Sequence, residues 1–334
     1  MRRRVVVAWW TFALLAAALA WLGLEFRRDL QRHAARLAEG SRVVATACGP
    51  VEVGFAGPAD GPPLLVVHGS GGGFDQGLLL GAGHAARGWR VIAPSRPGYL
   101  RTPYPADGDA SGERQADGLA CLLDTLGVPR VALMGVSAGG VPALHFALRH
   151  PRRLAALVLM VPAVHRPDPA VPTPRWALAV LDQVLKADLP FWLLVRVAPD
   201  AARRLVLATP AAEYAAASAD ERRRADALLD SILPVSARRR GLLNDSRLTT
   251  GAARVALEAV QVPTLVISAR DDGYGTWSSA RYSAEHIPGA RFLGYARGGH
   301  LLLGHEAEVV AAVQALQPLL DEPAPPTGTR QSAR

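Results

Sequence analysis

Short, almost purely apolar runs that alternate with longer segments of helical periodicity are the feature that most restricts how this 334-residue chain can fold. Most of the runs are near-continuous Val, Leu and Ile, which is typical of strands buried on both faces of a parallel sheet. Their alternation with helical patterns predicts a mostly parallel sheet covered by helices. We expect eight strands, at Val43–Ala47, Val51–Phe55, Leu64–Val67, Arg90–Ala93, Val131–Met134, Ala156–Val161, Thr264–Ser268 and Arg291–Tyr295.

The helical patterns between these strands include one long interval without any convincing strand. From residue 163 to residue 260 only helical patterns occur, for example Trp176, Val180 and Val184 at helical spacing. The interval predicts a helical cap inserted into the sheet domain. We expect its apolar face to pack on that domain; a pocket lining or a membrane-facing lid is the alternative. Helices are expected elsewhere at Gln115–Leu126, Ala138–His150, Thr276–His286 and Glu306–Leu320.

The N-terminus carries a membrane signal. After three arginines, an apolar run extends from Val5 to Leu24, with Thr11 as its only distinctly polar residue. Twenty helical residues span about 30 Å, the hydrocarbon thickness of a bilayer. Residues 1–28 therefore predict a single-pass transmembrane anchor, and the preceding arginines favour a cytoplasmic N-terminus and an extracytoplasmic domain. A cleaved secretion signal ending in the small residues at 18–20 is the alternative.

Two polar segments flank the predicted sheet domain. Residues 29–42 predict a helical stalk or linker, and residues 321–334 predict a disordered tail. The core then comprises residues 43–162 and 261–320. The net charge of +8 comes almost wholly from arginines scattered along the chain. Because no zinc-finger spacing, helix-turn-helix pattern or aromatic-interleaved basic stripe accompanies this charge, we expect no nucleic-acid partner.

The two cysteines, Cys48 and Cys121, provide neither a disulfide framework nor a metal cluster. Cys48 lies in an early strand region, and Cys121 lies in an expected helix. We therefore expect two separate small core residues; a single bridge between them is the alternative.

Ser137 is the candidate nucleophile. It stands in the sequence Gly-Val-Ser-Ala-Gly at 135–139, where a buried strand turns into a helix. Gly135 and Gly139 leave room for a strained serine backbone, since larger side chains would collide with the helix and the strand. A Gly-x-Ser-x-Gly motif arises by chance in roughly one chain in eight of this length and composition. The assignment therefore depends on the strand-to-helix context and on partners elsewhere in the chain.

A glycine-rich turn provides the expected oxyanion hole. Residues 68–73 read His-Gly-Ser-Gly-Gly-Gly and directly follow the third expected strand. Such a turn frees backbone N–H groups to point at a substrate carbonyl. We expect the N–H of Ser70 to be one donor, with Gly71 as the next choice, and the N–H of Ala138 to be the other. A phosphate-binding loop is disfavoured because no Lys-Ser or Lys-Thr follows, and His68 is expected to be structural.

Loops after two later strands supply the candidate acid and base. Asp272 follows a buried strand in a polar turn and is preferred to its neighbour Asp271, while Asp168 is a remoter alternative acid. His300 follows the last strand behind two glycines, whereas its competitor His305 opens the last expected helix. Serine, aspartate and histidine thus occur in the order expected of a nucleophile elbow and its partners.

These residues resemble the α/β-hydrolase superfamily over the segment from about Gly61 to Leu320. The turn Pro-Ser-Arg-Pro-Gly-Tyr at 94–99 is similar to the Asp-Arg-Pro-Gly-Tyr turn of its members, with Ser95 where Asp is usual. That difference affects a structural turn more than catalysis. The resemblance implies the α/β-hydrolase fold, an α/β architecture with a mostly parallel eight-stranded sheet and a helical cap, here preceded by the transmembrane helix.

The resemblance also implies a mechanism. His300 would take the proton from Ser137 as its hydroxyl attacks a carbonyl, and Asp272 would orient the imidazole and stabilise its cation. An acyl-enzyme and its hydrolysis by water follow. No metal and no organic cofactor are expected. Serine at the elbow argues against the dehalogenase and epoxide-hydrolase branches, which require a carboxylate nucleophile.

The expected activity is that of a serine hydrolase, an esterase of class EC 3.1, acting on a small-molecule acyl substrate. Amide or carbon–carbon bond hydrolysis, a cofactor-free perhydrolase and an acyltransferase are alternatives on the same triad. A membrane-tethered binding protein that keeps the fold without turnover is an alternative of a different class. The oligomeric state is left open by the sequence.

Overall fold

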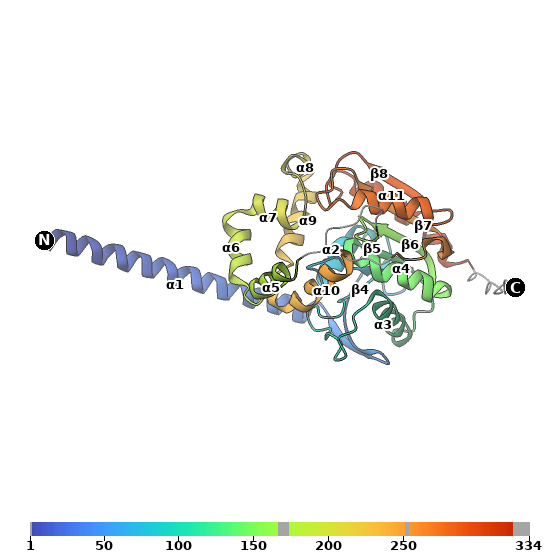
Figure 1. The fold of residues 1–334 in the computed structure, drawn as a ribbon, viewed down its shortest axis with the longest axis horizontal. Helices are drawn as coiled ribbons and strands as arrows, with labels where there is room; N and C mark the ends of the chain where they lie inside the picture. Colours follow the sequence, from blue (N-terminus) through green and yellow to red (C-terminus); the bar gives the residue numbers. More distant parts are fainter. Residues whose placement is uncertain (1, 166–173, 251–253, 323–334) are drawn as a thin grey trace.

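The structure, a computed structural model, describes residues 2–165, 174–250 and 254–322, and its centre is an eight-stranded sheet (Figure 1). The strand order is β1-β2-β4-β3-β5-β6-β7-β8. The pairs β1–β2 and β2–β4 are antiparallel, and all other neighbouring strands are parallel. The strands are β1 (Arg42–Thr46), β2 (Gly49–Ala56), β3 (Pro63–Val67), β4 (Arg90–Pro94), β5 (Val131–Val136), β6 (Leu154–Met160), β7 (Thr264–Ala269) and β8 (Arg291–Tyr295). All eight predicted strands are confirmed, and no end differs by more than two residues.

Helices cover both faces of the sheet, because successive side chains of each buried strand point to opposite sides. Leu65 of β3 belongs to the apolar cluster formed with α3, α4 and α11, whereas its neighbour Leu64 belongs to the cluster formed with α2 and α12. These helices are α2 (Phe74–Ala85), α3 (Gly112–Thr125), α4 (Gly140–Arg149), α11 (Thr276–His286) and α12 (Glu306–Gln314).

Helix α2 is absent from the predicted elements. Its segment contains three glycines, which are poor helix formers, and local propensity therefore argues against it. Packing reverses that preference. A Cβ atom on Gly77 would lie 2.8 Å from the Cβ of Ala93, and one on Gly81 would lie 2.7 Å from a methyl group of Val91. The glycines thus allow the helix to approach β4 closely.

Three predicted helices differ in extent from the observed ones. The helix expected over Gln115–Leu126 is α3, which begins three residues earlier, at Gly112, and ends one residue earlier, at Thr125. The helix expected over Ala138–His150 begins with a 3₁₀ turn at Ser137–Gly139, and α4 starts only at Gly140. The helix expected over Glu306–Leu320 ends as an α-helix at Gln314 and is followed by a 3₁₀ turn at Gln317–Leu320. Pro318 explains the second break, since its ring would clash with the carbonyl of residue 314 in a continuous helix.

Between β6 and β7 the described residues form helices and no strand. We call these helices the cap. Figure 1 shows them gathered at one end of the sheet domain. They are α5 (Arg175–Val184), α6 (Leu189–Val197), α7 (Pro199–Val206), α8 (Ala211–Ala216), α9 (Ala219–Asp230) and α10 (Arg239–Thr250), with short 3₁₀ turns at Val235–Arg238 and Leu257–Ala259.

The N-terminal segment is one continuous helix, α1 (Arg2–Glu39), which projects from the rest of the molecule (Figure 1). It contains a stretch long and apolar enough to cross a membrane, none of which is buried. Of the segment predicted to be a stalk or linker, residues 29–39 form the last part of this helix, and Arg42 is already the first residue of β1. There Asp29, His33 and Leu37 are buried against the folded domain. Most of the expected disordered tail, residues 323–334, lies outside the described residues.

The expectation for the cysteines is wrong in its preferred form. Cys48 lies in the exposed turn between β1 and β2, and Cys121 lies half-buried on α3. A disulfide joins the two across 73 positions of the sequence, which was the alternative. Neither residue belongs to the core, because the β1–β2 turn lies at the edge of the sheet, where Cys48 contacts α3.

Candidate active site

Ser137 lies at the tip of a sharp turn between β5 and α4. Its φ angle is +52°, in the left-handed region that non-glycine residues seldom adopt. The expected role of its glycine neighbours agrees with the contacts around them. A Cβ atom on Gly135 would lie 2.5 Å from the Cβ of Ala143, and one on Gly139 would lie 2.3 Å from the carbonyl oxygen of Val67. Larger residues at either position would force the turn open.

Asp272 and His300 meet beyond the ends of β7 and β8. Asp272 Oδ2 lies 2.8 Å from His300 Nδ1, and the carboxylate also accepts hydrogen bonds from the hydroxyl of Thr276 and the N–H of Tyr274. Burial by itself raises the pKa of Asp272. The charge and hydrogen bond of His300, with the hydrogen bonds from Thr276 and Tyr274, outweigh burial and lower the pKa of Asp272 below its ordinary value. The carboxylate is therefore ionised at neutral pH.

The competing acids and base occupy other places. Asp271 accepts hydrogen bonds from the N–H groups of Gly298 and Gly299, at 3.2 and 2.9 Å, and so holds the loop that carries the histidine. His305 precedes α12, where its ring stacks on Tyr295 at 3.7 Å. Asp168, the remoter alternative, lies outside the described residues.

Ser137 and His300 both line a cavity of about 320 Å³. The ring of Tyr274 lies edge-on to the imidazole of His300, with ring centres 4.8 Å apart. Among the described residues, no hydrogen bond joins the hydroxyl of Ser137 to this imidazole. Such bonds are often long in ligand-free enzymes and tighten when substrate binds. Apolar side chains form much of the remaining wall: Leu80, Val136, Met160, Val164, Val206, Leu207, Leu228, Ile232 and Leu301.

The glycine-rich turn lies directly against the serine. A Cβ atom on Gly69 would stand 3.1 Å from the Cβ of Ser137. Within the part of the chain that the structure describes, the N–H of Ser70 has no hydrogen-bond partner, and Ser70 lines the cavity. The N–H of Gly71 instead donates a hydrogen bond to the hydroxyl of Tyr99 at 3.4 Å, and Gly71 does not line the cavity. Ala138 is buried in the middle of the 3₁₀ turn.

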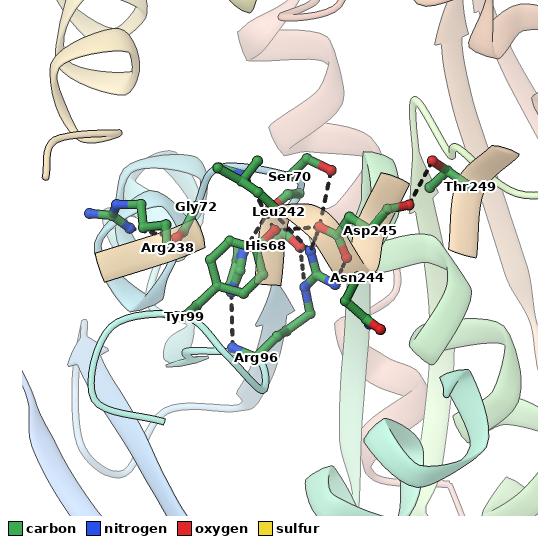
Figure 2. A network of polar contacts seen from close by, with 12 residues as sticks. His68, Ser70, Gly72, Arg96, Tyr99, Arg238, Leu242, Asn244, Asp245 and Thr249 are labelled. Carbon is green, nitrogen blue, oxygen red and sulfur yellow. Dashed lines mark hydrogen bonds and ion pairs between the residues drawn. The ribbon is translucent and has the colours of Figure 1, made fainter. Parts of the chain in front are cut away.

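A buried polar network holds this turn in place (Figure 2). Asp245 of α10 accepts two hydrogen bonds from the guanidinium of Arg96, at 2.7 and 2.5 Å, and one from the hydroxyl of Ser70 at 3.0 Å. Arg96 also donates to the carbonyl oxygens of His68 and Gly69. Both members of the ion pair are almost fully buried. A cap residue is thereby connected to the backbone beside Ser137.

A second buried pair supports the same turn. Arg238 donates to the carboxylate of Asp75 at 2.9 Å and to the carbonyl oxygen of Gly72 at 2.5 Å. Burial and the charge of Asp245 raise the pKa of Tyr99 well above its ordinary value, so its hydroxyl stays protonated and donates to Asp245. Figure 2 shows Arg238 and Tyr99 beside the glycine-rich turn.

His68 plays the structural part that the sequence predicts. Its ring is fully buried, and its Nε2 accepts a hydrogen bond from the N–H of Arg96 at 3.0 Å. Its Nδ1 must then carry the proton that is donated to the carbonyl oxygen of Gly69. Burial, followed by the charge of Arg96, lowers the pKa of His68 well below its ordinary value, and the ring is neutral.

Sequence reasoning missed the residues that support the site. Asp245 is separated from Ser70 by 175 positions, and no local pattern indicates that the two are in contact. For Thr276 the sequence holds a weak signal. This residue begins α11 four positions after Asp272, close enough in the chain for its hydroxyl to bind the carboxylate. In the described residues, no group of three or more His, Cys, Asp or Glu side chains is arranged to hold a metal ion.

Comparison with known proteins agrees with this architecture. Residues 62–307 match the family model described as the alpha/beta hydrolase fold, and the chain therefore belongs to that family. It is 31% identical over 270 residues to a putative carbamate hydrolase, RutD, of Variovorax paradoxus, a match that covers 78% of this chain and 92% of the relative.

Two further similarities concern a shorter segment and the fold. A segment of 102 residues is 41% identical to a 2-hydroxymuconate semialdehyde hydrolase of Pseudomonas putida, covering 30% of this chain and 36% of that protein. An alpha/beta hydrolase fold protein of Nakamurella multipartita superposes with a TM-score of 0.69 at 29% identity, over 84% of this chain and 99% of its own. The chain is accordingly a hydrolase of the α/β fold.

Proposed function

We propose that the protein is a membrane-anchored serine hydrolase that cleaves a carboxylic ester through an acyl-enzyme. The observation that carries the proposal is the 2.8 Å contact between His300 Nδ1 and the ionised Asp272, at the edge of the cavity that Ser137 also lines. A carboxylate on Nδ1 directs the free Nε2 lone pair away from itself, as a general base requires.

The steps follow from these positions. His300 removes the proton from the hydroxyl of Ser137 as its oxygen bonds to the ester carbonyl, and the imidazolium is stabilised by Asp272. The N–H groups of Ser70 and Ala138 receive the negative charge on the carbonyl oxygen. The imidazolium then protonates the departing alcohol, and water repeats the sequence to release the acid. The buried ion pairs around the turn keep the Ser70 donor in position before substrate arrives.

The cavity favours a neutral ester over the substrate named for the 2-hydroxymuconate semialdehyde hydrolase of Pseudomonas putida. A muconate carries a carboxylate, and its burial needs a cationic partner. Among the described residues that line the cavity, none is Arg or Lys. The apolar wall suits the alkyl parts of an ester of small to moderate size, since 320 Å³ is near the lower end for ligand pockets.

We propose further that α1 is an uncleaved anchor and that the catalytic domain is extracytoplasmic. Arginines precede the apolar stretch, which favours a cytoplasmic N-terminus. The Cys48–Cys121 disulfide fits the same side, because disulfides persist in oxidising compartments. The intact mass of the chain purified from cells tests the anchor, since cleavage after residue 20 would remove most of the apolar stretch.

Labelling with a fluorophosphonate probe, followed by peptide mapping, tests the nucleophile. We expect the wild-type chain to be labelled on Ser137 and the Ser137→Ala variant to be unlabelled, while both show the same thermal unfolding. A folded wild-type chain that resists the probe would support the alternative of a binding protein without turnover.

Product analysis separates the reactions that share this triad. With p-nitrophenyl esters of increasing chain length, we expect acyl transfer to water. Transfer predominantly to added alcohol or to hydrogen peroxide would identify an acyltransferase or a perhydrolase instead. A higher kcat/KM for an amide or for a carbon–carbon substrate than for every ester would overturn the ester assignment.

A further inference from the structure

The outer side of the cap exposes large apolar side chains. Outside α1, most of the strongly exposed large apolar residues among those described lie on α5, α6 and α7. Trp176 is 72% exposed, Val197 is 78% exposed and Leu205 is 65% exposed. These helices pack on one another through their other apolar residues. A monomeric soluble protein seldom exposes so many large apolar side chains on neighbouring helices. We call Trp176, Val180, Val184, Leu189, Val197 and Leu205 the outer cap surface.

Helix α5 shows how one-sided this surface is. Trp176, Val180 and Val184 follow each other at intervals of four residues and therefore lie along one helix face. None of the ten residues of α5 is fully buried. The preferred expectation from the sequence, that this apolar face packs on the sheet domain, is therefore wrong for these three side chains. They face outward instead.

The anchor helix fixes the orientation of this surface. Asp29 of α1 accepts a hydrogen bond from the indole N–H of Trp192 on α6 at 2.8 Å and forms an ion pair with Arg196. The rings of Phe26 and Trp192 are 5.5 Å apart, and His33 Nε2 lies 3.6 Å from a carboxylate oxygen of Asp230 on α9. The cap and the end of the anchor are thus held together.

Distances along α1 place α6 near the bilayer. The apolar run ends at Leu24, and Asp29 lies five residues later, which is about 8 Å along a helix. The polar layer on each side of the hydrocarbon core is about 5 to 8 Å thick. A cap helix that contacts Phe26 and Asp29 therefore reaches the level of the lipid headgroups. Figure 1 shows the free part of α1 leaving the molecule on the side of α5, α6 and α7, with the sheet beyond them.

We propose that the outer cap surface rests in the headgroup layer of the same bilayer that holds α1. Its occupant is a phospholipid surface with anionic headgroups, because Arg175 and Arg204 stand next to Trp176 and Leu205 in the sequence and are themselves exposed. Apolar side chains flanked by arginines are typical of helices that lie in a membrane interface.

The outer cap surface adjoins the cavity that contains Ser137. The inference about the substrate in this paragraph rests on the function proposed above. Leu205 is exposed on α7, whereas the next two residues, Val206 and Leu207, line the cavity. An amphiphilic ester in the outer part of the bilayer would therefore have a short path to Ser137. The substrate class that this arrangement favours is an ester carried by the membrane.

Spin labels on the full chain, reconstituted in vesicles of phosphatidylcholine and phosphatidylglycerol, test the surface without relying on activity. The native cysteines form a disulfide, so an added cysteine is the free thiol. The variants are Val180→Cys and Val197→Cys, with Val43→Cys as a matched control. Val43 is also exposed, but it follows the end of α1 at Glu39, about 22 Å beyond Leu24.

We expect labels at 180 and 197 to be at least about threefold less accessible to a water-soluble nickel chelate than the label at 43, and more accessible to oxygen. Equal accessibility to the chelate at all three sites would overturn the proposal. Protection of 180 and 197 from both reagents would also overturn it, by indicating a second copy of the chain on this surface. If alkaline carbonate extracted the chain from vesicles, α1 would not be a transmembrane anchor, and the proposal for the outer cap surface would fail with it. The esterase activity is measured separately, so this result would not depend on the proposed function.

Discussion

The two sides of the cap are built in opposite ways. The side that faces the catalytic cavity is held by buried charged pairs, Arg96 with Asp245 and Arg238 with Asp75. The side that faces away consists of exposed apolar residues on α5 to α7.

A buried charge is costly unless its partner is in place, so each inner pair specifies one position of the cap relative to the glycine-rich turn. Exposed apolar residues have no such partner within the chain. The difference indicates that contacts within the protein fix the position of the inner side, whereas the apolar residues of the outer side are suited to contacts with the surroundings of the protein.

The largest expected effect tests whether the inner side encloses a catalytic site. We expect Ser137→Ala and His300→Ala each to lower kcat/KM for a p-nitrophenyl ester by at least about 10³-fold, with little change in thermal stability. His305→Ala is the matched control and should stay near wild type, because its ring stacks on Tyr295 away from the cavity. An active His300→Ala variant beside an inactive His305→Ala variant would reassign the base.

The next effect tests the buried pair of the inner side. Asp245→Ala leaves the guanidinium of Arg96 buried without its partner, and we expect a loss of about 3 to 5 kcal/mol of unfolding free energy. Asp200→Ala removes the carboxylate of an exposed pair with Arg203 and should cost less than about 1 kcal/mol. Denaturant unfolding of the detergent-solubilised chain measures both. Equal losses would mean that burial does not distinguish these pairs.

A somewhat smaller effect concerns pH at the contact between α2 and the cap. Burial, with the charge of Arg224 on α9, lowers the pKa of His84 to about 4. Since the unfolded chain binds this proton near pH 6.5, the stability that the neutral ring contributes is present above pH 6.5 and is lost as the pH falls toward 4. The full loss is about 3 kcal/mol.

Thermal unfolding between pH 7 and pH 4 measures this loss, with His84→Gln as the variant that cannot titrate. We expect the variant to lose less stability than the wild type over this range. Parallel curves for the two proteins would show that the inner contact does not depend on this ring.

The smallest effect is expected on the outer side. Val180→Ser and Val197→Ser should change the unfolding free energy in detergent by less than about 0.5 kcal/mol, because their side chains have little to lose within the chain. Val235→Ser, at a buried cap position, serves as the control and should cost more. A large loss from Val180→Ser would mean that the outer side is also specified by the protein.

Much of the fold could be predicted because it depends on local patterns. All eight strands follow from short apolar runs, and helix periodicity located α11 to the residue. Helix α2 could not be predicted, because its glycines are explained only by the strand beneath them. The same holds for the disulfide, since neither the strand region of Cys48 nor the helix of Cys121 reveals that the two meet.

The sheet, the turn at Ser137 and the order of the candidate acid and base could be predicted from the sequence, because each depends on a short motif whose chemistry and backbone requirements lie within a few residues. Three contacts become visible only in the folded chain: Asp272 rather than Asp271 faces His300, Asp245 reaches the turn beside Ser137, and α1 is attached to the cap. These contacts join groups from separate elements, some more than 140 positions apart, and a sequence pattern does not specify which distant partner satisfies a buried charge.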